Sequence, residues 1–326
     1  MQHRNYSIDV FRLLGAFSVV TLHVKYGDLY NPAVLAIRGL GRYAVPFFFL
    51  ISGYLFFNNV TSRGDKQFSL TLRNLLSILL AADLMYFLVG IFVDSPLLDE
   101  PPLSFPTIAN GLSGHLWFMG SMIFGYVVLN YLFNKLDDRF LLVAAISTYA
   151  FVLANDAYTS LLHITPAKEA SRFFVSISFL TIGYLLNKHN ITSKVPLWLA
   201  VLVTLFGFFL QTAEIVLLYK YTGASPHNQE FLFGTALFAV GLILIATKLQ
   251  LSTDNIFARI GRKYSLLIYL YHPLFILAIF SFIDIAAWGG GWLYLVAPLL
   301  TFVVCLGTLM LIEKLSPKVF KLLNGL

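Results

Sequence analysis

This sequence has little charge and almost no cysteine. Charged residues make up 12% of its 326 residues and hydrophobic residues 58%, whereas about a quarter of a soluble domain is charged. The single cysteine, Cys305, excludes an intrachain disulfide and a cysteine-rich metal site. The seven histidines form no H-E-x-x-H motif, and Gly289 to Gly291 lack the strand–turn–helix setting of a phosphate loop. The sequence indicates a membrane protein and predicts no metal site.

Long apolar runs follow one another along the chain. Because a membrane-spanning helix needs about 20 apolar residues, we predict an all-α polytopic protein with one membrane domain over residues 1–326. The first run contains Arg12 and His23, so we expect a retained span rather than a signal peptide. The fifth and sixth runs are the shortest. The predicted spans lie at about 8–25, 41–60, 69–93, 114–134, 139–154, 172–187, 196–219, 231–248, 264–283 and 291–313.

The basic residues predict the orientation. The net charge of +6 comes from Lys and Arg beside the apolar runs, which is typical of membrane proteins and implies no nucleic-acid partner. We assume ten crossings and a cytoplasmic N-terminus. Of the 22 Lys and Arg, fifteen then fall on the cytoplasmic side, six fall on the outer side, and Arg12 lies inside the first span. This bias places both termini in the cytoplasm. The six outer residues are Lys25, Arg38, Arg42, Lys168, Arg172 and Lys220.

Two polar side chains share one face of the first span. Arg12 and His23 are eleven positions apart, which is about three helical turns and about 16 Å along the axis. The small or slim residues Ala16 and Val19 lie between them on that face, where a neighbour or a ligand could fit. An arginine inside a span costs about 2.5 to 3.5 kcal/mol, so we expect this face to meet a protein-lined or watery interior.

Four stretches occur in order: RLLGAFSVVTLH (12–23), RYAVPFFFLISGYLFF (42–57), HLWFM (115–119) and SLLIYLYHPLF (265–275). Together they resemble the integral-membrane acyltransferase 3 family, which transfers acyl groups from cytoplasmic coenzyme A thioesters to sugar hydroxyls or other acceptors. Within the family, the chain is most similar to short stand-alone bacterial O-acetyltransferases, such as the one that modifies enterobacterial common antigen. The resemblance implies an enzyme that uses acetyl-CoA to O-acetylate a cell-surface glycan or lipid-linked sugar.

The resemblance also implies roles for individual residues. Arg12 and His23 correspond to the essential arginine and histidine of the family's first span. His23 is the predicted general base, or alternatively the residue that carries the acyl group in a two-step relay. Tyr271 is an alternative to Tyr269 in the last stretch. The expected acceptor-binding residues are Arg42, Ser52, His115, Trp117, Tyr269 and His272.

The basic residues on the cytoplasmic side are candidates for binding the donor. Arg12 is expected to hold a coenzyme A phosphate or line the donor's channel, or else to pair with Asp9. A cluster just before the ninth span is either an orientation signal or a second phosphate-binding group. Its residues are Arg259, Arg262 and Lys263.

Structural explanations compete with several of these roles. Arg42 and Trp117 suit the membrane interface, and Ser52 next to a glycine suits close helix packing. Pro273 should free backbone carbonyls that then line a cavity or find other donors. Asp83 and Glu214, inside apolar runs, are either a proton relay or paired carboxyl groups.

Two other functions remain open. A transporter of a lipid-linked sugar or small anion would perform no acyl chemistry, and an acyltransferase could instead modify a small molecule. Neither the acceptor nor the oligomeric state follows from the sequence.

Overall fold

A computed structural model describes residues 5–24, 31–92, 104–251, 253–282 and 292–325. Lys25 and Gly289 to Gly291 lie outside the described residues. The described residues form helices and no strand: α1 (Tyr6–His23), α2 (Pro32–Gly41), α3 (Ala44–Phe92), α4 (Phe105–Asn110), η1 (Gly114–Leu116), α5 (Trp117–Phe133), α6 (Asp138–Asn155), α7 (Thr159–Leu162), α8 (Lys168–Lys188), α9 (Ile191–Lys194), α10 (Leu197–Thr222), η2 (Pro226–Asn228), α11 (Phe233–Lys248), α12 (Ile256–Phe282), α13 (Trp292–Leu315) and α14 (Pro317–Leu323).

The predicted all-α polytopic membrane fold is confirmed. Within the described ranges, eight helices are long and apolar enough to cross a membrane, including those at the short fifth and sixth runs. The two other predicted spans correspond to α11, a shorter apolar helix of 16 residues, and to α1, an 18-residue helix that carries Asp9, Arg12 and His23. The eight spans are Pro32–Asn58, Lys66–Phe92, Gly114–Phe133, Asp138–Asn155, Lys168–Lys188, Leu197–Thr222, Ile256–Ser281 and Val296–Leu315.

The second span begins nine residues before the predicted position 41, because α2 and the first half of α3 form one continuous crossing. Arg42 therefore lies inside the span instead of opening it. The close approach of α2 to α1 explains this packing, since a Cβ on Gly41 would come within 2.7 Å of Thr21 Oγ1. The span also contains Arg38, which the sequence places before it.

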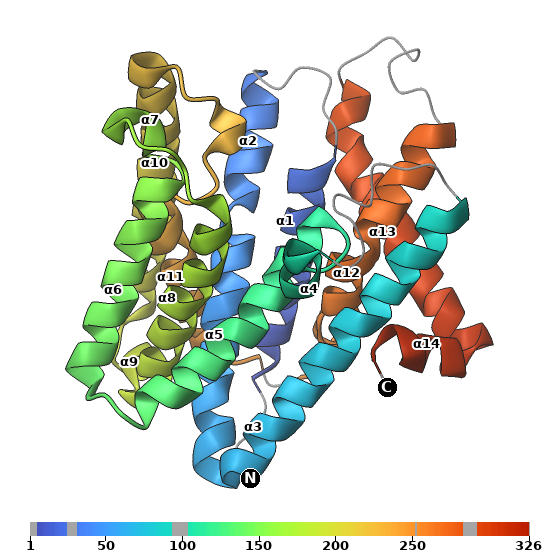
Figure 1. Cartoon of the computed structure of the whole chain (residues 1–326), viewed down its shortest axis with the longest axis horizontal. Coiled ribbons are helices and arrows are strands. Elements are labelled where there is room, and N and C mark those ends of the chain that lie inside the picture. The colour runs from blue at the N-terminus through green and yellow to red at the C-terminus, as the bar shows by residue number, and fades with distance from the viewer. Residues whose placement is uncertain (1–4, 25–30, 93–103, 252, 283–291, 326) are drawn as a thin grey trace.

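A sharp turn at Gly64 separates the second and third spans. Its φ of 58° and ψ of −152° are not helical, and glycine reaches this conformation without steric cost. The second half of α3 consequently runs back across the bundle as the long diagonal helix in Figure 1.

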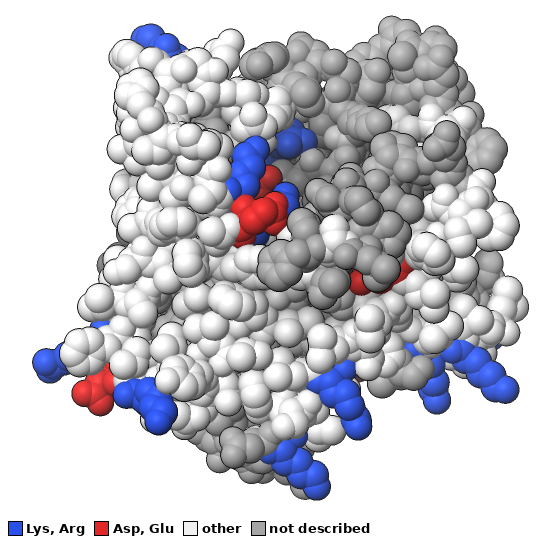
Figure 2. Space-filling model, in the orientation of Figure 1, with Lys and Arg blue, Asp and Glu red and all other residues white. Residues whose placement is uncertain are grey.

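The helix α1 lies in the middle of the bundle, where it packs along α12 and also contacts α2, α3, α11 and α13. The α10–α11 pair and the α6–α8 pair form one side, and α12 with α13 forms the other (Figure 1). Figure 1 places both ends of the chain toward the lower end of the bundle, and Figure 2 shows lysines and arginines along that same lower edge. This arrangement agrees with the predicted cytoplasmic location of both termini.

Candidate active site

Two cavities lie inside the bundle, and each end of the polar face of α1 reaches one of them. Arg12 lines the first, which we call the Arg12 cavity and which has a volume of about 240 Å³. His23 lines the second, the His23 cavity, of about 130 Å³. Ala16, between them on α1, is fully buried and lines neither cavity. The track between the two polar residues is therefore packed at Ala16, whereas Val19 lines the His23 cavity.

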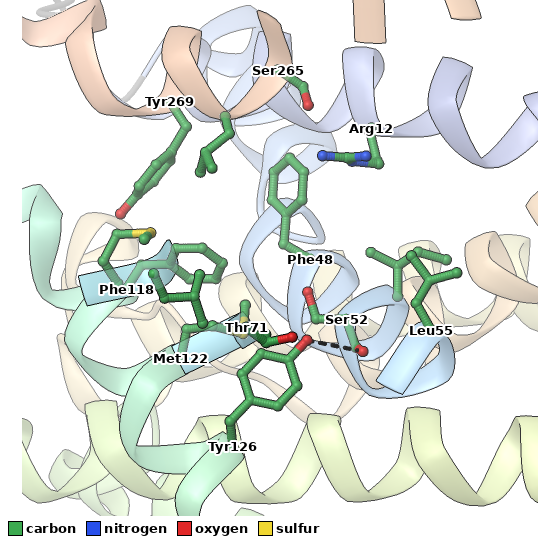
Figure 3. Close-up of a pocket in the computed structure, with 14 residues that line it drawn as sticks. Arg12, Phe48, Ser52, Leu55, Thr71, Phe118, Met122, Tyr126, Ser265 and Tyr269 are labelled. Carbon is green, nitrogen blue, oxygen red and sulfur yellow. Dashed lines mark hydrogen bonds between the residues drawn. The ribbon is translucent and has the colours of Figure 1, made fainter. Parts of the chain in front are cut away.

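The Arg12 cavity is mostly apolar with a few polar groups on its wall. Figure 3 shows Arg12 of α1 and Ser265 of α12 on one side of it, and Tyr126 and Ser52 on the other. The Tyr126 hydroxyl donates to the backbone oxygen of Ser52 at 3.1 Å. The Ser265 hydroxyl, by contrast, has no hydrogen-bond partner among the described residues. A long, thin and mainly apolar molecule with an occasional polar group suits such a cavity.

Arg12 forms its predicted ion pair with Asp9 and also lines a cavity. Its Nη1 lies 3.5 Å from Asp9 Oδ1, and its side chain lines the cavity with 25% of its surface exposed. Asp9 is buried where α12 approaches α1 at Gly261, whose Cβ position would overlap the Asp9 carbonyl. The ion pair orients the guanidinium, which still lines the cavity.

The His23 cavity is lined by charged groups of both signs. Arg38 and Arg42 come from α2 and the α2–α3 junction, and Glu230 from the segment between η2 and α11. Figure 2 shows basic and acidic side chains meeting in a hollow on the surface of the molecule. His115 and Trp117 also line this cavity. A polar, hydroxyl-bearing molecule suits these walls better than an apolar one.

Three histidines from distant parts of the chain lie close together: His23 and His115 line this cavity, and His272 is buried behind them and lines neither cavity. The ring centroids of His23 and His272 are 4.8 Å apart, those of His115 and His272 5.6 Å, and those of His23 and His115 6.3 Å. They come from α1, η1 and α12. No group of three or more His, Cys, Asp or Glu side chains in the described part of the chain is arranged to hold a metal ion.

The hydrogen bonds determine which nitrogen of His23 is available. Its Nδ1 lies 2.9 Å from the carbonyl oxygen of Val19, and because a carbonyl only accepts, Nδ1 carries the proton. The Nε2 of the neutral ring therefore has a free lone pair. The His23 side chain is exposed and lines the cavity, so this lone pair can accept a proton from a molecule bound there.

Pro273 explains how His272 is held. Proline has no N–H, so the carbonyl of Tyr269 lacks its usual donor four residues later in α12. Nδ1 of His272 donates to that carbonyl at 2.8 Å. Its Nε2 has no partner among the described residues although the ring is fully buried. The prediction that carbonyls freed by Pro273 find other donors is confirmed.

His115 is held on both ring nitrogens. Nε2 donates to the carbonyl of Leu270 at 2.9 Å, and Nδ1 accepts from the Ser113 hydroxyl at 3.2 Å. The Tyr86 hydroxyl also donates to the Leu270 oxygen, at 2.8 Å. With both nitrogens occupied, the ring of His115 lines the cavity as a fixed wall.

Arg42 is buried, with 8% of its surface exposed, and its guanidinium donates to the carbonyls of Pro226 and Gln229. This burial overturns the alternative that Arg42 is an interfacial anchor. The side chain ties η2 and the following residues to the start of α3. It lines the His23 cavity and shapes the segment that carries Glu230.

The structure brings together most of the predicted site residues. Tyr269 lines both cavities, whereas Tyr271 donates to the carbonyl of Leu323 at 3.0 Å and lines neither. Trp117 is buried and lies 5.4 Å under the guanidinium carbon of Arg172, so it is not a lipid-facing belt residue.

None of the three residues of the basic cluster before the ninth predicted span lines either cavity, although Arg262 Nη1 lies 4.0 Å from Oδ2 of Asp9, the partner of Arg12. Arg262 binds Asp254 through two hydrogen bonds of 3.1 and 3.0 Å, Arg259 lies 3.8 Å from the same carboxylate, and Lys263 pairs with Glu313. These residues lie in the first turns of α12, because that helix begins eight residues before the predicted span. Their charges are already paired at the end of the bundle.

The two intramembrane carboxyl groups hold backbone turns. Asp83 accepts from the N–H of Leu112 at 2.7 Å. Glu214 accepts from the N–H groups of Phe233 and Gly234 at 3.2 and 2.8 Å, and from the Tyr158 hydroxyl. Glu214 thus caps the beginning of α11 from the neighbouring helix α10, a position that favours a negative charge. Of the alternatives for these residues, the paired carboxyl groups match the structure.

Sequence reasoning missed Arg38, Glu230, Tyr86 and Ser265. Arg38 was assigned to a loop because the helix from Pro32 was not predicted, and the other three carry no local signal that distinguishes them from packing residues. Arg38 donates to the carbonyl of Leu22 at 2.7 Å, next to His23 in the chain. That contact between α2 and the end of α1 exists only in the folded chain.

Comparison with known proteins adds independent information. A family model described as an acyltransferase domain matches residues 5–311. A serine/alanine racemase of Enterococcus gallinarum is 27% identical over 83% of this chain and 40% of its own length. An amino-acid racemase of Enterococcus faecalis is 25% identical over 86% of this chain and 42% of its own.

The chain spans about 40% of the length of these curated relatives. No solved structure shows significant similarity to it. Because the family model covers nearly the whole chain, including every residue of the two cavities, this chain belongs to the acyltransferase 3 family of integral-membrane acyltransferases.

Proposed function

We propose that this protein is a membrane O-acyltransferase, most simply an O-acetyltransferase, that transfers the acetyl group of acetyl-CoA to a hydroxyl of a cell-surface glycan or lipid-linked sugar. The observation that carries this proposal is the pair of cavities, with Arg12 in one and His23 in the other. Family membership makes acyl transfer the starting expectation, and the cavities supply a separate place for each substrate.

The donor would enter from the cytoplasmic end. Its arm, mainly apolar with a few amide groups, matches the Arg12 cavity, and the Arg12 guanidinium suits a phosphate or a polarised carbonyl oxygen near the cavity mouth. The paired basic cluster of Arg259, Arg262 and Lys263 would contact the donor's other phosphates only by exchanging its carboxylate partners.

The acceptor would bind in the His23 cavity, against Arg42, His115 and Trp117. Nε2 of His23 would remove the hydroxyl proton as the oxygen attacks the thioester carbon. The new carbon–oxygen bond forms, the carbon–sulfur bond breaks, and the departing thiolate takes up the proton. A relay in which His23 first carries the acyl group uses the same lone pair. The ring centroid of His272 lies 4.8 Å from that of His23. At this distance His272 would help to stabilise the proton that His23 takes up.

A small hydroxy amino acid is a second candidate acceptor. The relatives are named as racemases of serine, alanine or other amino acids, and the walls of the His23 cavity hold both arginines and a glutamate. Such walls suit a molecule that carries an ammonium and a carboxylate group. A transporter of the same ligand is the remaining alternative.

The experiment uses inside-out membrane vesicles or proteoliposomes that contain the full chain, with acetyl-CoA labelled in the acetyl group. We expect label in envelope polysaccharide or lipid-linked sugar, and a loss of about 10²–10⁴-fold in rate in His23→Ala. Label in O-acetylserine selects the second acceptor. The control is His189→Ala, because His189 is exposed and pairs with Asp138 away from both cavities.

Two outcomes would overturn the proposal. Movement of a sugar or amino acid across the bilayer without any consumption of acetyl-CoA would make the protein a transporter. Normal acetyl transfer by both His23→Ala and Arg12→Ala would remove the proposed roles of these residues.

A further inference from the structure

Tyr269 is the wall between the two cavities. Its side chain lines the Arg12 cavity on one side and the His23 cavity on the other, and only 3% of its surface is exposed. Figure 3 shows its ring projecting from α12 beside Phe118, across the cavity from Ser52. Ala16, which lies between Arg12 and His23 on α1, is fully buried and lines neither cavity, and Tyr269 is the one described residue that lines both of them.

The ring of Tyr269 is held in place on both sides. Its hydroxyl donates to the backbone carbonyl of His115, and its ring centroid lies 5.0 Å from that of Phe118 in an edge-to-face contact. The His115 ring, 5.9 Å from the Tyr269 ring, is itself fixed by Ser113 and Leu270. The wall is therefore a positioned side chain and not a loosely packed one.

A wall at this position solves a chemical problem of the proposed reaction. The His23 cavity carries charged groups and is open to water, and a base that removes a proton from a sugar hydroxyl also removes one from water. Water would then attack the thioester carbon, the carbon–sulfur bond would break, and acetate and the free coenzyme A thiol would form. If the Tyr269 ring keeps the thioester apart from His23, and turns aside only once a bound acceptor has displaced the water, this loss is prevented and transfer still takes place.

We propose that Tyr269 is the partition that couples thioester use to the presence of an acceptor, and that its ring limits the length of the acyl group that can reach His23. This inference rests on the proposed function. Tyr269 acts in it as a positioning residue whose removal changes the fate of the acyl group as well as the rate.

The chain offers a matched control. Tyr271 is also buried on α12, with 2% of its surface exposed, and also donates its hydroxyl to a backbone carbonyl, that of Leu323 at 3.0 Å. It lines neither cavity. Tyr269→Ala and Tyr271→Ala each remove a buried ring and one hydrogen bond, and only the first opens a path between the cavities.

The test measures the release of free coenzyme A thiol from acetyl-CoA with and without acceptor, in proteoliposomes containing the full chain. We expect the ratio of thiol release without acceptor to acetyl transfer with acceptor to rise at least tenfold in Tyr269→Ala. The rise should be smaller in Tyr269→Phe, which keeps the ring and loses its hydrogen bond. The same ratio in Tyr271→Ala should equal that of the wild type. Tyr269→Ala should also accept butyryl-CoA better, relative to acetyl-CoA, than the wild type does.

An unchanged ratio of release to transfer in folded Tyr269→Ala, or the same increase in Tyr271→Ala, would overturn the partition while leaving the proposed function intact. If Tyr269→Ala does not fold, Tyr269→Leu decides, because leucine removes the ring and keeps a larger apolar side chain, and an unchanged ratio there overturns the partition. A wild-type protein that never consumes acetyl-CoA would refute the proposed function and the partition together.

Discussion

At the scale of single residues, the outer end of the bundle holds a carboxyl group in an unusual environment. Asp156 follows α6 directly, and its Oδ2 accepts from the backbone N–H of Phe231 at 2.7 Å. Burial, and then the negative charge of Glu230, raise its pKa from 3.8 to about 7, although Arg42 acts in the opposite direction. Asp156 thus gains or loses its charge near neutral pH, in contact with the segment that carries Glu230.

This shift predicts how stability depends on pH. Between about pH 4 and pH 7 the folded chain holds a proton on Asp156 that the unfolded chain has lost, so rising pH through this window lowers the free energy of unfolding, by at most about 4 kcal/mol. In Asp156→Asn the amide oxygen still accepts from Phe231, and the decline should disappear. Melting temperatures of both proteins in detergent from pH 4 to pH 8 check this. Parallel declines in the two proteins would show that Asp156 is not responsible.

At the scale of helices, small residues allow the crossings on which the cavities depend. A Cβ on Gly53 of α3 would overlap the carbonyl of Leu180 in α8, and a Cβ on Gly183 of α8 would overlap the carbonyl of Leu50. The two backbones therefore touch at a pair of glycines. The structural explanation for the Ser52-Gly53 pair holds for Gly53, while Ser52 itself lines the Arg12 cavity.

The contrast between two glycines tests this packing. Gly53→Ala forces α3 away from a backbone atom and should lower the free energy of unfolding by about 3 kcal/mol, because backbone neighbours do not yield as side chains do. Gly307→Ala, on an exposed face of α13 with no atom within 4 Å of the added carbon, should be neutral or stabilise the helix by up to about 1 kcal/mol. Thermal melting in one detergent compares them. Equal losses in the two variants would contradict the close crossing.

At the scale of the whole molecule, the ten predicted crossings and the basic residues at one end define an orientation. Both ends of the chain lie toward the lower end of the bundle, where lysines and arginines line the lower edge (Figures 1 and 2). In the predicted orientation, the Arg12 cavity would face the cytoplasm and the His23 cavity the outside.

Cysteine labelling tests this orientation. Cys305 is buried and is the single cysteine of the sequence, so a Cys305→Ser background has no thiol of its own. Thr165 and Lys194 are exposed at opposite ends of α8. Thr165→Cys should react with a membrane-impermeant maleimide in intact cells, and Lys194→Cys only after permeabilisation. The reverse pattern would invert the assignment and place the Arg12 cavity outside.

The largest difference between the predicted and observed spans concerns Arg38 and Arg42. Two arginines in ten residues indicate a loop by any hydropathy rule, yet both lie in a span because their guanidinium groups donate to the carbonyls of Leu22, Gln229 and Pro226. Those acceptors are far away in the sequence or at the end of another helix. The residue type alone gives the cost of placing a charge inside a span. It does not give the partners that offset this cost.

Local patterns were sufficient for the helical class, the ten apolar runs, the shared face of Arg12 and His23, and the four stretches that indicate the family, because periodicity, charge bias and motifs are properties of neighbouring residues. The meeting of His23, His115 and His272, the burial of Arg42, and the position of Tyr269 between two cavities depended on the tertiary structure. Each results from packing between helices up to about 250 residues apart in the sequence, and the period of one helix contains no information about which neighbour its polar face will meet.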